Sequence, residues 1–314
     1  MNNIFGIVPS RRLGRSLGLS TIPICTCTYS CIYCQLGRTR NMTMQRKEFF
    51  KLDDLLEQLE WYKVKREQFD VITLVGEGEP TLYNQTGALI DGIKSLFDKP
   101  VALITNGSLF YQKDVRQDCL KADIVMPTLD AWDEESFTTL NRPIKQITFE
   151  KMYNGMKAFR KIYKGEFYLE VMCVKGITDR GNNMELLTKK ITELNPDKVF
   201  INTPVRPPAE EWVKRCSPEF VERLRKQFKS NEDIEIPNTD LYSPNSDIYQ
   251  AILEIIKRHP LDQSSIERFC EIREKDSGKI LKRLRDDVNV EKIQYESKNF
   301  FRIKSKRDDD QRGA

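Results

Sequence analysis

The sequence has one histidine, no long apolar run and little net charge. His259 alone leaves histidine-rich metal sites and hydrolytic sites with a histidine base almost nothing to use. No apolar run could span a membrane, and the N-terminus lacks a secretory signal pattern. A net charge of +4 does not by itself imply a nucleic-acid partner. We expect a cytoplasmic protein whose chemistry depends on cysteines, carboxylates, lysines, tyrosines or a cofactor.

Eight cysteines in such a protein are expected to be ligands or reduced core thiols. Four are isolated in the sequence and are expected to be buried: Cys119, Cys173, Cys216 and Cys270. Cys27, Cys31 and Cys34 have the spacing C-x3-C-x2-C, which suits an iron–sulfur cluster. Three cysteines would leave one iron of a four-iron cluster without a protein ligand. Zinc that also used Cys25 is the competing interpretation, although zinc prefers two separated C-x2-C hooks.

Strands alternate with amphipathic helices over the first two hundred residues. Continuous apolar runs predict strands at 19–24, 71–75, 101–105, 123–129, 167–174 and 198–201. Apolar residues at helical spacing predict helices at 52–62, 86–97, 113–120, 149–163, 184–194 and 217–229. This order predicts an α/β fold, a partial (β/α)6 TIM-like barrel of parallel strands with helices outside. Residues 4–18, with three arginines among glycines, are expected to be irregular: a solvated arm, or a segment near something anionic.

Polar and glycine-rich residues follow the predicted strands. They occupy 76–82, 106–108, 127–131, 140–143, 175–179 and 202–208. Ligands of parallel α/β sheets bind at the carboxyl ends of the strands, where these segments would meet. One such segment is ordinary turn chemistry, but all of them at one rim predict a site.

The C-terminal part predicts a second, smaller domain. We expect a first domain over 1–236, a linker at 237–246, a winged-helix-like domain of three helices and a hairpin at 247–304, and a disordered tail at 305–314. The third helix would present four basic side chains: Lys279, Lys282, Arg283 and Arg285. This domain could bind nucleic acid, bind a peptide or protein, or simply pack.

The cysteine motif resembles the signature of radical S-adenosylmethionine (SAM) enzymes. Gly78-Glu79-Pro80 is similar to the "GGE" motif of these enzymes, with Glu77 where the first glycine usually stands. Five further stretches resemble iron–sulfur oxidoreductases grouped with the wyosine-forming tRNA synthases: 5–14, 34–39, 129–131, 141–143 and 202–208. The resemblance covers roughly residues 5–210. The additional N-terminal cysteine set of the wyosine enzymes is not found here, where Cys25 is the one extra cysteine in this region.

This resemblance implies cofactors and residues for them. A [4Fe-4S] cluster would be bound by Cys27, Cys31 and Cys34, and SAM would chelate its open iron. The SAM-binding residues implied are Tyr33, Gly78, Glu79, Pro80, Thr105, Asn106 and Asp130. Arg142 and Arg206 are either clamps for an anionic substrate group or salt-bridged loop arginines.

The resemblance also implies the chemistry. A one-electron donor of the ferredoxin or flavodoxin type would reduce the cluster, and SAM would be cleaved to methionine and a 5′-deoxyadenosyl radical that abstracts hydrogen. The expected substrate is a tRNA base, with a peptide or protein side chain as the alternative. A zinc protein that binds nucleic acid without catalysis is a more distant alternative.

Overall fold

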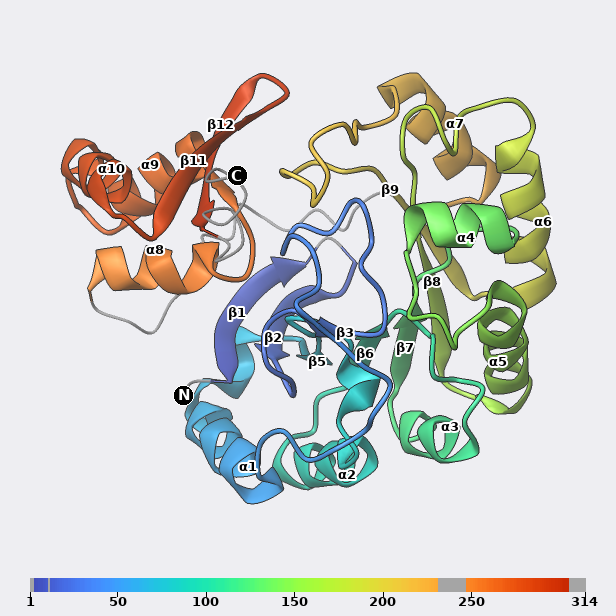
Figure 1. The fold of residues 1–314 in the computed structure, drawn as a ribbon. Helices are drawn as coiled ribbons and strands as arrows, with labels where there is room; N and C mark the ends of the chain where they lie inside the picture. Colours follow the sequence, from blue (N-terminus) through green and yellow to red (C-terminus); the bar gives the residue numbers. More distant parts are fainter. Residues whose placement is uncertain (1–2, 11, 231–246, 305–314) are drawn as a thin grey trace.

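Six parallel strands and one antiparallel edge strand form the main sheet of this computed structural model (Figure 1), which describes residues 3–10, 12–230 and 247–304. The strand order is β1-β2-β5-β6-β7-β8-β9. The strands are β1 (Ile4–Ser10), β2 (Gly14–Leu19), β5 (Val71–Leu74), β6 (Val101–Thr105), β7 (Ile124–Pro127), β8 (Glu166–Met172) and β9 (Lys198–Asn202). Because β2 and β5–β9 run parallel, their carboxyl ends meet at one rim. The chain thus has a mixed α/β fold with a parallel-dominated sheet.

Helices follow the strands as the apolar spacing predicts. They are α1 (Leu52–Glu60), α2 (Thr86–Leu96), α3 (Lys113–Cys119), α4 (Glu134–Leu140), α5 (Phe149–Ile162), α6 (Asn183–Leu194) and α7 (Pro218–Gln227), with 3-10 turns η1 (Trp61–Gln68) and η2 (Pro80–Leu82). Helix α4 was not expected from the sequence. This helix is short, but Asp133 and Ser136 form a capping box at its start, and Phe137 and Leu140 are buried.

Two predictions at the N-terminus are wrong. The first parallel strand is β2 at Gly14–Leu19 and not 19–24, and the segment expected to be irregular is the antiparallel hairpin β1–β2. Glycines and arginines interrupt the apolar alternation that would have predicted these strands. Gly14 has φ +79° at the turn, and Gly18 leaves room for the Phe5 ring, which a Cβ at position 18 would approach to 2.0 Å. Two of the segment's arginines pair with acidic side chains of the protein, Arg15 with Asp70 at 2.7 Å and Arg12 with Glu170.

The two faces of the sheet bury different clusters. Alternate residues such as Val125, Leu169 and Ile201 belong to the large core shared with the helices. Their neighbours Met126, Tyr168 and Phe200 form a small apolar cluster on the other face, against which Leu13, Ile104 and Ile124 pack. All four isolated cysteines are buried, as expected.

The C-terminal unit, residues 247–304, has its own core. It consists of α8 (Ile248–Ile256), β10 (Leu261–Asp262), α9 (Gln263–Ile272), α10 (Ser277–Asp286), β11 (Val290–Tyr295) and β12 (Lys298–Ile303), with sheet order β10-β12-β11. The three helices and the hairpin lie where the sequence predicts them, and the short strand β10 was not expected. Asp247, Asp262 and Asp276 cap the three helices. The predicted linker at 237–246 and tail at 305–314 lie outside the described residues.

In the described ranges, every helix falls short of the length and apolarity that crossing a membrane requires.

Candidate functional site

The three motif cysteines lie together in the loop that follows β2. Cys27 ends the two-residue strand β3 (Thr26–Cys27), which pairs with β4 (Asn41–Met42). Burial above all, with a smaller contribution from a neighbouring cysteine of the set, raises the pKa of Cys27 and raises the pKa values of Cys31 and Cys34 to about 12. Mutually repelling, buried thiolates are a donor set that a cationic iron core would stabilise, since coordination deprotonates thiols. These side chains therefore fit an iron–sulfur cluster.

The structure gives less support to a single metal ion, such as zinc, at this loop. Among the residues that the structure describes, no three Cys, His, Asp or Glu side chains are placed to hold one metal ion. Cys25, the extra thiol of the zinc interpretation, is buried with φ +58° and its Sγ lies 3.6 Å from the Leu36 carbonyl. In a cubane the three cysteines would bind three different irons. The separation of these side chains therefore counts against one zinc ion and does not count against a cluster.

Two asparagine amides contact the thiols. Asn106 Nδ2 lies 3.5 Å from Cys27 Sγ, and Asn141 Nδ2 lies 3.5 Å from Cys31 Sγ. Asn106 was among the predicted residues, whereas Asn141 was not, although it belongs to the Asn-Arg-Pro stretch that the sequence singled out. Amide donors to sulfur stabilise the thiolate form, which any metal ligation requires.

The Gly78-Glu79-Pro80 turn lies directly against the cysteine loop. Gly78 forms a parallel bridge with Thr26, and a Cβ on Gly78 would lie 1.8 Å from the Thr26 carbonyl oxygen. The Glu79 N–H donates to that same carbonyl at 3.0 Å. Only glycine fits at position 78, because the backbones of the two motifs are in contact there. The turn and the cysteines therefore form one structural unit at the rim.

The Glu79 side chain is buried and fully hydrogen-bonded. Its carboxylate accepts from Thr105 Oγ1 at 2.6 Å, from the Asn106 N–H at 2.7 Å and from the Thr81 N–H at 3.0 Å. Burial raises its pKa, and the Thr105 and Thr81 hydroxyl bonds oppose that shift. The carboxylate thus fastens the end of β6 to the turn, and Pro80 begins η2 immediately after it.

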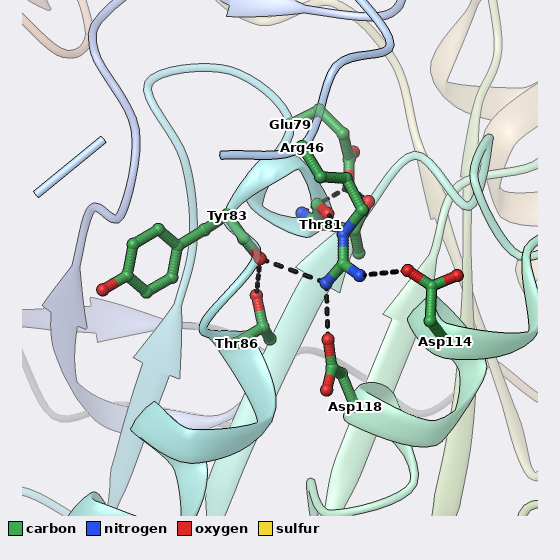
Figure 2. Close-up of polar contacts among 7 residues, drawn as sticks. All are labelled: Arg46, Glu79, Thr81, Tyr83, Thr86, Asp114 and Asp118. Carbon is green, nitrogen blue, oxygen red and sulfur yellow. Dashed lines mark hydrogen bonds and ion pairs between the residues drawn. The ribbon is translucent and has the colours of Figure 1, made fainter. Parts of the chain in front are cut away.

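Arg46, which no sequence motif marks, holds the other end of this turn (Figure 2). Its Nε donates to the Thr81 carbonyl at 2.9 Å and its Nη2 to the Tyr83 carbonyl at 3.2 Å. The same guanidinium pairs with Asp114 at 2.6 Å and Asp118 at 2.5 Å, both on α3. One side chain from the segment after the cysteines therefore joins the turn to a helix.

Asp130 lies in the segment that follows β7, in a second buried network. It accepts from the Tyr33 hydroxyl, from Asn141 Nδ2 at 3.0 Å and from the Met172 N–H at 2.7 Å. Burial raises the pKa of Asp130 to about 6, and the bonds from Tyr33 and Asn141 limit that rise. Tyr33 and Asp130, predicted from separate motifs, are thus in direct contact beside Cys31.

The two candidate substrate arginines have protein partners. Arg142 pairs with Glu210, which also accepts two bonds of 2.9 Å from Arg38. The hydrogen bonds from Arg38, and to a smaller extent the one from Arg142, lower the pKa of Glu210. Arg206 Nη1 donates to the Gln35 side chain at 3.2 Å. The salt-bridged interpretation thus describes Arg142 in this structure. The role of Glu210 was missed because no local pattern marks it.

Comparison with known proteins identifies the class. Residues 21–187 match the Radical SAM superfamily, and the chain belongs to that superfamily of enzymes. It is 35% identical over 318 residues to a UPF0026 protein of Methanocaldococcus jannaschii, covering 96% of each chain.

Two further matches cover less of their partners. A protein of Brachyspira hyodysenteriae named GTPase Obg is 41% identical over 233 residues, which are 74% of this chain and 34% of that protein. The chain thus spans about a third of that relative. The solved structure of SuiB from Streptococcus suis bound to precursor peptide SuiA is similar in fold, with a TM-score of 0.51 at 16% identity, covering 74% of this chain and 51% of that chain.

Proposed function

We propose that this chain binds a [4Fe-4S] cluster through Cys27, Cys31 and Cys34 and binds SAM at the adjoining rim. The observation that carries the proposal is the direct contact between the cysteine loop and the Gly78 turn. Of the predicted SAM-binding residues, Thr105 and Asn106 donate to the Glu79 carboxylate, and Tyr33 donates to Asp130 in the second network. Bound there, the two cofactors would supply reductive cleavage of SAM and hydrogen abstraction from a substrate carbon.

The protein's own residues would bind, orient and exclude water. Glu79 and Asp130 are committed to positioning bonds, so we assign them to shaping the site and not to proton transfer. The six parallel strands and their helices would form the partial barrel around it. A one-electron donor of the ferredoxin or flavodoxin type is required to reduce the cluster.

We further propose that the substrate is a base in RNA. The C-terminal unit has the order helix, short strand, two helices and hairpin, which is that of a winged helix. Its third helix α10 presents exposed basic side chains: Lys279, Lys282, Arg283 and Arg285. Such side chains suit phosphate contacts.

A peptide substrate is the alternative. SuiB, similar in fold, was solved with a precursor peptide. The RNA proposal also loses some support at Arg283. This side chain lies over the Tyr249 ring, 3.7 Å from its centre, and so already has one partner within the unit.

The test is 5′-deoxyadenosine formation from SAM and dithionite after anaerobic reconstitution. The proposal requires product from the protein alone, and faster product with transcribed tRNA than with a matched amount of unstructured peptide. No 5′-deoxyadenosine under either condition would contradict the cofactor assignment. Stimulation by peptide alone would contradict the RNA assignment.

A further inference from the structure

Glu77, the residue that departs from the family motif, pairs with an arginine of the C-terminal unit. Its Oε1 lies 3.3 Å from Nε of Arg258, which follows α8, and both side chains are about 15% exposed (14% and 15%). We infer that Arg258 is a positioning residue that couples docking of the C-terminal unit to the Gly78-Glu79-Pro80 turn. This inference rests on the proposed function of that turn in binding SAM.

Glu77 is placed to transmit such a contact. Its backbone carbonyl accepts from the Cys25 N–H at 2.6 Å, and the next residue, Gly78, lies against Thr26. The side chain of Glu77 therefore reaches the C-terminal unit while its backbone is bonded to the cysteine loop. A shift of the carboxylate would move the backbone that precedes Glu79.

The ion pair belongs to a wider contact between the C-terminal unit and the sheet. The Arg258 guanidinium lies 5.3 Å from the centre of the Phe5 ring on β1, and Figure 1 shows the C-terminal unit beside that edge of the sheet. The Tyr295 hydroxyl donates to the Pro204 carbonyl at 3.1 Å, and Glu296 pairs with Arg215 at 3.8 Å. The unit therefore touches the first strand, the Gly78 turn and the segment after β9.

Charge makes the partner of Arg258 important. His259, next in the chain, has its pKa lowered to about 3 by burial and by Arg206 and Arg258, so it is neutral at physiological pH. Both arginines thus act on the same imidazole, and the Glu77 carboxylate offsets the charge of Arg258 directly. Removing one partner of a buried pair leaves the other charge uncompensated, which costs more than removing both.

This asymmetry defines the experiment. The variants are Arg258→Gln, Glu77→Gln and the double variant, each reconstituted with iron and measured for SAM affinity by equilibrium binding. The matched control is the pair between Arg302 Nε and Glu291 Oε1 at 2.7 Å, which lies within the β11–β12 hairpin and is similarly buried. Arg302→Gln should leave SAM affinity unchanged.

We expect Arg258→Gln to weaken SAM binding about 10-fold, a coupling of ordinary size. The double variant should bind SAM at least as well as Arg258→Gln. By reciprocity SAM should slow amide hydrogen exchange at Leu261 and Asp262 in the unaltered protein, and do so less in Arg258→Gln.

The outcomes separate this inference from the function beneath it. If the unaltered protein binds no SAM, the proposed function is wrong. If the unaltered protein binds SAM and both single variants bind SAM as tightly as it does, the coupling is wrong and the proposed function stands. Should Arg258→Gln fail to fold, Glu77→Gln, which keeps the side-chain shape, decides by the same two measurements. Loss of thermal stability with unchanged SAM affinity would make the pair purely structural and would also overturn the inference.

Discussion

Replacing Arg46 with lysine tests how the turn at the site is held. Arg46 donates from Nε and Nη2 to two backbone carbonyls of the turn, at Thr81 and Tyr83, in addition to its pairs with Asp114 and Asp118. A lysine keeps the charge but has one donor group, so it cannot reproduce the planar set of bonds. The structure therefore predicts loss of at least two charge-assisted hydrogen bonds.

The magnitude follows from those bonds. A hydrogen bond to a charged group contributes about 1.5–3 kcal/mol, so losing two should lower the free energy of unfolding by about 3–6 kcal/mol. For a chain of 314 residues, with an unfolding entropy of about 2.1 cal/mol/K per residue, that is a fall in Tm of roughly 5–9 °C. Because Thr81 also donates to Glu79, SAM affinity should fall as well. Thermal unfolding and equilibrium SAM binding measure the two effects.

Asp114→Asn provides the control for Arg46→Lys. The Asp114 side chain is 65% exposed, and exposed ion pairs contribute less than about 1 kcal/mol, so this variant should unfold within about 3 °C of the unaltered protein. If Arg46→Lys is no less stable than Asp114→Asn, the two carbonyl bonds do not hold the turn and the reasoning fails.

Three further predictions concern separate parts of the chain. Gly78→Ala should abolish SAM binding, because a Cβ would lie 1.8 Å from the Thr26 oxygen; binding at the unaltered affinity would refute the contact. The pKa of His259 is lowered to about 3 in the folded protein, from its ordinary 6.5, so protonation favours unfolding and stability should fall as the pH drops from 6.5 to 3. In urea titrations, His259→Gln should make the stability depend less steeply on pH over this range. An unchanged pH dependence would show that His259 is not its source. Neutralising the basic side chains of α10 should weaken RNA binding and flatten its salt dependence in filter-binding assays. The positions are Lys279, Lys282, Arg283 and Arg285. Unchanged RNA affinity would favour a peptide substrate.

The sequence predicted the elements whose signals are local. Five of the six expected strands, the longer helices and the cysteine loop lie where apolar spacing and motif spacing put them. The hairpin β1–β2 escaped because its register depends on Gly18 accommodating the Phe5 ring, a contact that spacing along the chain does not reveal. A strand whose alternating face contains glycine has no periodic apolar signal to read.

The residues that hold the site were the least predictable. Arg46, Glu210 and Arg258 each contact partners far away in sequence, and each looks like an ordinary surface charge in the linear chain. Glu77 gave one usable signal, because it replaced a glycine of the motif. Its partner on the C-terminal unit could be found only from the folded structure.

Iron and sulfide content after anaerobic reconstitution decides whether the three cysteines bind a cluster. We expect about four irons and four sulfides per chain in the unaltered protein and in Cys25→Ser. The variant that replaces Cys27, Cys31 and Cys34 with serine should lose both iron and sulfide. Full iron and sulfide content in that triple variant, or a single zinc that depends on Cys25, would contradict the cluster assignment.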